Sequence, residues 1–263
     1  MVLDVIDPAR YGGTVASILF VGILLALMGG RRLGLRNIAR NGHAGSSVGS
    51  LETAIFALLG LLIAFTFSGA LNRFDSRRAD AVREANAMGS AWLRLDLLPA
   101  SAQPALRERF RAYADARIAT YRALPDVGAA QQHLDRSIKL QGDIWSGTIA
   151  ALALPGVRTG SEPVVVNAMN DMIDMMAVRV YSTRIHPPTV IYAMLVVLAL
   201  AAALLAGYQS AAERGYDWIH KIGFAAMVSF TVYVILDMEY PRLGLIRIDA
   251  IDQVLVDARA AMK

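Results

Sequence analysis

The sequence predicts an all-α membrane protein with four transmembrane helices and a helical bundle inserted between the second and the third. Three observations support this fold class. Hydrophobic residues make up 56% of the 263-residue chain. Four uncharged apolar windows are candidate membrane spans. The residues between the second and third windows repeat apolar and charged side chains with the period of amphipathic helices.

The first two candidate spans lie near the start of the chain. Residues 11–28 carry no charge and are followed by two arginines, and residues 53–71 are bounded by Glu52 and Arg73. The first run is expected to stay in the chain as a signal anchor, because no small-x-small cleavage site follows it. These two runs predict a membrane hairpin.

The third and fourth candidate spans follow a pair of prolines. Residues 189–209 begin directly after Pro188, where the missing N–H of proline suits the start of a helix. Residues 222–236 form the fourth span and meet Asp237 and Glu239 at its end. The predicted division of the chain is 1–71 with spans one and two, 72–186 as an extramembrane bundle continuous with span two, 187–240 with spans three and four, and 241–263 as a C-terminal tail.

The inserted bundle is predicted to contain four amphipathic helices. No proline occurs between the second span and Pro99, so residues 52–98 can form one helix of about 70 Å that couples the span to the bundle. Further helices are expected over 101–124, with Ser101 as N-cap, and over 129–154 and 162–185. Short connections between such helices are typical of a bundle.

Composition and motifs argue against an enzyme, a metalloprotein and a nucleic-acid-binding protein. The chain has no cysteine, and its four histidines lie far apart and outside metal-binding spacings. Its net charge is +4, but arginines alternate with acids, as at 107–109, which is typical of a solvated helix face. Asp171 and Asp174 could bind a cation, but pairing with Arg179 or Arg184 is the stronger interpretation. No catalytic residue, metal or other cofactor is predicted.

The distribution of arginines leaves the orientation in the membrane open. Arg31, Arg32, Arg36 and Arg40 lie between the first two spans without an acid, which favours a cytoplasmic loop and a periplasmic bundle. Arginines at the other end of span two favour the opposite orientation, with a cytoplasmic bundle. The expected location is the cell (inner) membrane, with a multi-pass topology and the lipid bilayer as a partner.

The second span has two distinct faces. Gly60, Ala64 and Ser68 recur every four residues and predict close helix packing in lipid. The other face carries a bulky apolar stripe with two possible roles. It is either a surface that faces lipid or the bundle core, or a pore constriction that gates by dewetting. In the second case, Glu52 would form a ring of carboxylates at the pore mouth. The members of the stripe are Phe56, Ile63, Phe67 and, beyond the membrane, Phe74.

Charged residues cluster where spans two and four end on the same side of the membrane. Carboxylates this close to hydrocarbon usually need a partner. We therefore expect boundary ion pairs in which Asp237 or Glu239 binds Arg73, Arg77 or Arg78.

Several segments closely resemble the bestrophin-like domain family of bacterial membrane proteins. They are LLIAFTFSGA at 61–70, RFDSRR at 73–78, EANAMG at 84–89, WLRLDLLP at 92–99, NDMID at 170–174 and DMEYPRLGLIR at 237–247. The resemblance covers nearly the whole chain. It implies a relationship to bestrophins, which are pentameric ion channels with four spans per subunit and a helical domain between spans two and three.

The resemblance also implies a role for the second span. The second helix of bestrophins lines the pore and carries a neck of Ile and Phe side chains, a pattern similar to Phe56, Ile63 and Phe67. No bestrophin calcium cluster aligns with this sequence. The leading hypothesis is a homo-oligomeric, pentameric channel for inorganic ions. The alternative is a non-conducting membrane scaffold or sensor whose bundle binds a partner or ligand.

Overall fold

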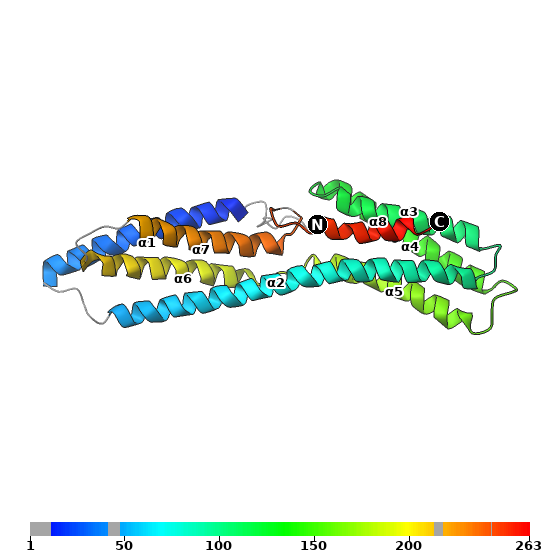
Figure 1. The fold of residues 1–263 in the computed structure, drawn as a ribbon, viewed down its shortest axis with the longest axis horizontal. Helices are drawn as coiled ribbons and strands as arrows, with labels where there is room; N and C mark the ends of the chain where they lie inside the picture. The colour runs from blue at the N-terminus through cyan, green and yellow to red at the C-terminus, as the bar shows by residue number, and fades with distance from the viewer. Residues whose placement is uncertain (1–11, 42–47, 213–217, 243) are drawn as a thin grey trace. The chain divides into compact units, whose positions relative to one another are not determined.

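The computed structural model describes residues 12–41, 48–212, 218–242 and 244–263, and every regular element within them is a helix (Figure 1). The chain divides into two compact units. The first unit comprises Met1–Arg73 with His186–Ile246, and the second comprises Phe74–Ile185 with Arg247–Lys263. One helix, α2 (Val48–Arg94), contributes residues to both.

The first unit holds the apolar part of α2 together with α1 (Gly12–Asn41), α6 (Thr189–Gln209) and α7 (Trp218–Glu239). These four helices are the ones in the described residues that are long and apolar enough to cross a membrane. The fourth is longer than the 222–236 predicted from sequence. It includes Lys221, whose ammonium donates to Ser210 Oγ at 3.3 Å in the 3₁₀ turn η2 (Ser210–Ala212) that follows α6.

Helix α1 packs against α6 and α7 and approaches α6 closely through glycines. A Cβ atom at Gly30 would lie 1.9 Å from the carbonyl oxygen of Leu204, and one at Gly207 would lie 2.1 Å from that of Leu27. Only glycine permits such backbone contact between helices. The Gly30–Gly34 spacing is the signal that sequence reasoning missed, since it assigned small-residue packing to span two.

The second unit holds the rest of α2 with α3 (Gln103–Arg122), α4 (Val127–Leu152) and α5 (Ser161–Ser182). The predicted N-cap at Ser101 is wrong, because α3 starts two residues later with Ala102 as N-cap and a proline in its first turn. The N-cap of α4 is Asp126, whose carboxylate accepts the Ala129 N–H at 3.0 Å.

The C-terminal residues belong to the core of the second unit. The 3₁₀ turn η3 (Asp249–Asp252) leads into α8 (Gln253–Ala260), which packs on α3. Leu255 and Met262 are buried in the same apolar cluster as Phe110 and Met169. Residues 247–263 of the predicted tail therefore belong to this unit and cover apolar surface of the helices before them, whereas 241–246 belong to the first unit.

Candidate functional site

The apolar part of α2 is the most exposed of the four candidate spans. In its most apolar window 11% of the residues are buried, against 22%, 28% and 33% in α1, α6 and α7. Leu58, Leu61 and Phe65 are 50%, 52% and 67% exposed. One side of α2 therefore does not pack against any described residue of its own chain.

The small residues of α2 lie on this uncovered side. Gly60, Ala64 and Ser68 are all exposed. A Cβ atom at Gly60 would have no neighbouring heavy atom within 4 Å. The packing that sequence spacing predicts for these residues therefore has no partner helix within the described residues, and a second chain or lipid must supply it.

The bulky stripe of α2 lies at the edge of the face that packs inward. Phe56 meets Phe224 of α7 with ring centroids 5.5 Å apart, and Ile63 packs against the core of the first unit. Phe67 is more open, at 38% exposure. Phe74 belongs to the second unit, where the Arg78 guanidinium lies 5.9 Å from its ring. Glu52 is half-buried near the start of the helix.

At the end of α7, Glu239 forms the centre of a charged cluster. Its side chain is completely buried, and Arg73 of α2 donates to it through Nε at 2.8 Å and through Nη2. The other carboxylate oxygen lies 3.5 Å from His186 Nδ1, and the His186 ring stacks on Tyr240 with centroids 4.5 Å apart. The ion pair with the Arg73 guanidinium offsets the desolvation cost of the buried Glu239 carboxylate.

The remaining boundary residues predicted from sequence have other partners. Asp237 accepts the backbone N–H groups of Leu245 and Ile246 at 3.1 and 2.6 Å. Arg77 donates to the carbonyls of Ser182 and Ile185. Arg78 pairs with Asp75. Among the predicted combinations, the structure brings together Arg73 and Glu239.

The second unit contains a buried charge network that sequence reasoning missed. Glu84 of α2 is fully buried and binds Arg117 Nε of α3 at 2.6 Å and Arg179 Nη1 of α5 at 2.5 Å. Arg179 also binds Asp252 of η3 at 2.6 Å and lies over the Tyr121 ring at 3.8 Å. Two carboxylates thus balance two guanidinium groups, and four elements meet through side chains.

Burial and neighbouring charges shift the pKa values of Arg117 in this network and of Tyr113 beside it. Burial alone lowers the pKa of Arg117, but Tyr121 and Glu84 outweigh it and hold that pKa above its ordinary value. Burial, helped by the charge of Glu84, raises the pKa of Tyr113 well above its ordinary range. These groups therefore stay in one state at neutral pH, and the network is suited to fixing the helices rather than to transferring protons.

The interpretation of the bundle arginines as a solvated helix face was wrong for Arg117, and the expected pairing of Arg179 with Asp171 or Asp174 was also wrong. Both are buried, and Arg179 does not need Asp171 or Asp174, which are exposed. A signal was present, since Phe110, Tyr113, Arg117 and Tyr121 share one face of α3 at helical spacing. Among the described residues, no three acidic or histidine side chains are grouped to hold a metal ion.

Comparisons with known proteins point to one family. The model of the bestrophin-like domain matches residues 18–251. The fold is similar to the crystal structure of a tryptophan-to-alanine variant of a bacterial bestrophin homologue from Klebsiella pneumoniae, with a TM-score of 0.64 and 12% identity over 94% of this chain and 99% of that one. None of the curated proteins compared with the chain matches it.

Proposed function

The chain belongs to the bestrophin-like family, whose known members are ion channels, and we propose that it forms a homopentameric channel for inorganic ions whose pore is lined by α2. The family match makes a membrane channel the first expectation. The proposal concerns the number of subunits, the helix that lines the pore and the residues that narrow it.

The observation that carries this proposal is the exposure of α2. Apolar exposure alone can be satisfied by lipid, but Gly60, Ala64 and Ser68 on the same side favour close approach of another helix. Repeated around a symmetry axis, this face brings the α2 helices of neighbouring copies together. The spans α1, α6 and α7 then form the outer layer toward lipid.

Within this arrangement, Phe67 is our candidate for the constriction. Phe56 and Ile63 are held against the core of their own unit, whereas Phe67 is 38% exposed beside the small-residue face. A ring of Phe67 side chains excludes water from a narrow pore and so opposes ion passage. Glu52, near the start of α2, is the candidate for the mouth of the same pore.

The test is ion flux from liposomes that contain the purified full chain. We expect flux above that of empty liposomes, and a several-fold increase in the Phe67→Ala variant, because a smaller side chain widens and wets the constriction. Phe230→Ala is the matched control, since Phe230 is an equally bulky, 65% exposed side chain on α7. This control should leave the flux unchanged.

Two results contradict the proposal. One is wild-type protein that passes no ion while Phe67→Ala is also silent. The other is an equal increase in flux for Phe67→Ala and Phe230→Ala, which would indicate a general leak rather than a constriction on α2.

A further inference from the structure

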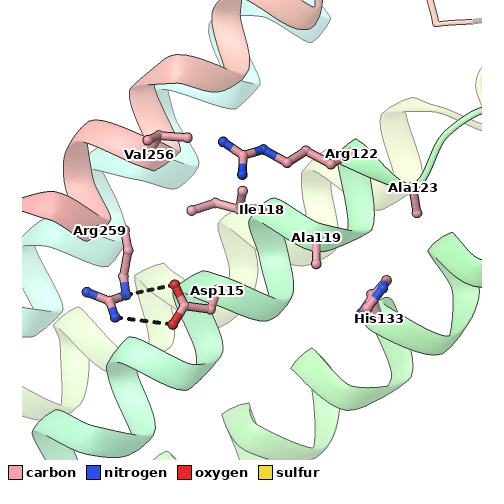
Figure 2. A pocket seen from close by; sticks show the side chains of 8 residues that line it. All are labelled: Asp115, Ile118, Ala119, Arg122, Ala123, His133, Val256 and Arg259. Atoms are coloured by element: carbon pink, nitrogen blue, oxygen red, sulfur yellow. Dashed lines mark hydrogen bonds and ion pairs between the residues drawn. The ribbon is translucent and has the colours of Figure 1, made fainter.

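The second unit contains a pocket between α3, α4 and α8, with a volume of about 530 Å³ (Figure 2). This size falls within the range of small-molecule sites. Ile118, Ala119, Ala123 and Val256 supply apolar walls, and four charged or titratable side chains complete the lining. The pocket is distinct from α2, the candidate pore helix.

One acid in the pocket is already neutralised. Asp115 of α3 accepts a hydrogen bond from Arg259 Nη2 of α8 at 3.2 Å, and its other carboxylate oxygen lies 2.8 Å from Arg259 Nε in the same ion pair. Figure 2 shows this pair as parallel contacts between the two side chains. The pair therefore contributes little net charge to the remaining space.

Arg122 leaves the pocket with an excess of positive charge. Figure 2 shows its side chain directed from α3 toward Val256 of α8, close to Ile118. Within the described part of the chain, no carboxylate pairs with it. The imidazole of His133 of α4 also lines the pocket. A guanidinium presents a planar fork of N–H donors that matches a carboxylate with two bonds.

We propose that this pocket binds a small organic anion, namely a carboxylate joined to a short apolar body. The carboxylate of the ligand pairs with the guanidinium of Arg122, as the carboxylate of Asp115 pairs with Arg259 in the same pocket. The apolar body lies against Ile118, Ala119 and Val256. Since the walls come from α3 and α8, the ligand adds contacts between the C-terminal helix and the rest of the unit.

The experiment uses the full chain in detergent micelles and a hexanoate probe that carries a terminal trifluoromethyl group, observed by ¹⁹F NMR. Signal from empty micelles is subtracted. We expect saturable binding, at least tenfold weaker binding of the corresponding neutral amide, and about a tenfold loss of affinity in Arg122→Gln, because a charge-assisted pair is removed.

Arg136→Gln is the control, since Arg136 is an exposed arginine of α4 outside the pocket lining. It should bind the probe as the wild type does, with an unchanged helical circular dichroism spectrum for both variants. The proposal is overturned if folded wild-type protein shows no saturable binding, if the amide binds as well as the acid, or if Arg122→Gln and Arg136→Gln bind equally. The readout requires no conductance, so it is independent of the proposed channel.

Discussion

The contacts between helices differ in the two units of the molecule. In the first unit, α1 and α6 approach so closely that glycine hydrogens at Gly30 and Gly207 face the backbone of the other helix. In the second unit, α2, α3, α5 and η3 meet through the charges of Glu84, Arg117, Arg179 and Asp252. Close backbone contact is therefore the distinguishing feature of the first unit, and a buried network of four charges is that of the second.

We attribute this difference to the proposed topology, in which the first unit lies in lipid and the second in water. Lipid provides little hydrophobic drive for helices to associate, so close backbone contact has to supply the packing energy. A water-surrounded bundle gains its stability from apolar burial, and its internal ion pairs mainly restrict which helices can meet and in what register. The two units should therefore respond to different substitutions.

The largest effect is expected when the charge network of the second unit is broken. Glu84→Gln leaves Arg117 and Arg179 without their shared carboxylate, and we expect a loss of about 3–5 kcal/mol in unfolding free energy. Thermal unfolding can be followed by tryptophan fluorescence, to which Trp92, 6% exposed in this unit, contributes. Glu162→Gln, at an exposed position of α5, is the control. Equal stability of the two variants would contradict the role of the network.

The next effect tests shape in the first unit. Gly207→Ala places a methyl group 2.1 Å from the carbonyl oxygen of Leu27, so α1 and α6 must separate. We expect a destabilisation of about 1–3 kcal/mol. Gly223→Ala on α7 meets no atom within 4 Å and should be neutral or slightly stabilising, as alanine favours helix more than glycine does. Thermal unfolding in detergent compares them, and indistinguishable midpoints would refute the close contact.

A smaller effect is expected at the N-cap of α4. Asp126→Ala removes the acceptor of the Ala129 N–H, and the expected cost is about 1 kcal/mol. Asp135→Ala, further along the same helix at an exposed position, is the matched control. Chemical denaturation measured by circular dichroism should separate them, and a cap variant as stable as this control would argue against the capping contact.

The smallest effect at neutral pH is expected for Tyr113→Phe. The hydroxyl of Tyr113 is buried and makes no hydrogen bond within the described residues, so its removal should cost almost nothing or be stabilising. Tyr121→Phe is the contrasting variant, because its hydroxyl accepts from Arg117 and its loss should destabilise. If Tyr113→Phe proved the more damaging variant, the hydroxyl would have to have a partner.

The same variant should change how stability depends on pH. The pKa of Tyr113 is raised in the folded protein, so its contribution is complete below the unfolded pKa of about 10 and is lost as pH rises above it. Wild-type protein should therefore lose stability above that pH more steeply than Tyr113→Phe. Parallel curves from denaturation at pH 9 to 11 would contradict the raised pKa.

Local patterns explain which parts of the fold were predictable. Apolar windows identified the four long apolar helices among the described residues, and the absence of proline predicted that span two continues into the second unit as α2. Helical spacing places Arg117 on the apolar face of α3, but its partner Glu84 is far away in the sequence, so no window shows which residue it binds. Helix α8 has eight residues, too few for a clear periodic signal.

The face of α2 that packs inward was also beyond local prediction. In an apolar helix both sides are hydrophobic, so periodicity gives no polar face to mark the outside. The stripe at Phe56 and Ile63 looked as exposed as the Gly60 face, yet contact with α7 and the core of the first unit covers it. Tertiary packing, rather than side-chain type, decides which side remains open.

The most direct test of the proposed channel is the symmetry of single particles of the full chain in lipid nanodiscs. We predict a closed five-fold ring with α2 innermost and the face of Gly60, Ala64 and Ser68 directed toward the axis or the neighbouring α2. Single copies, or a ring with α2 at the lipid perimeter, would contradict the proposal that α2 lines a pore.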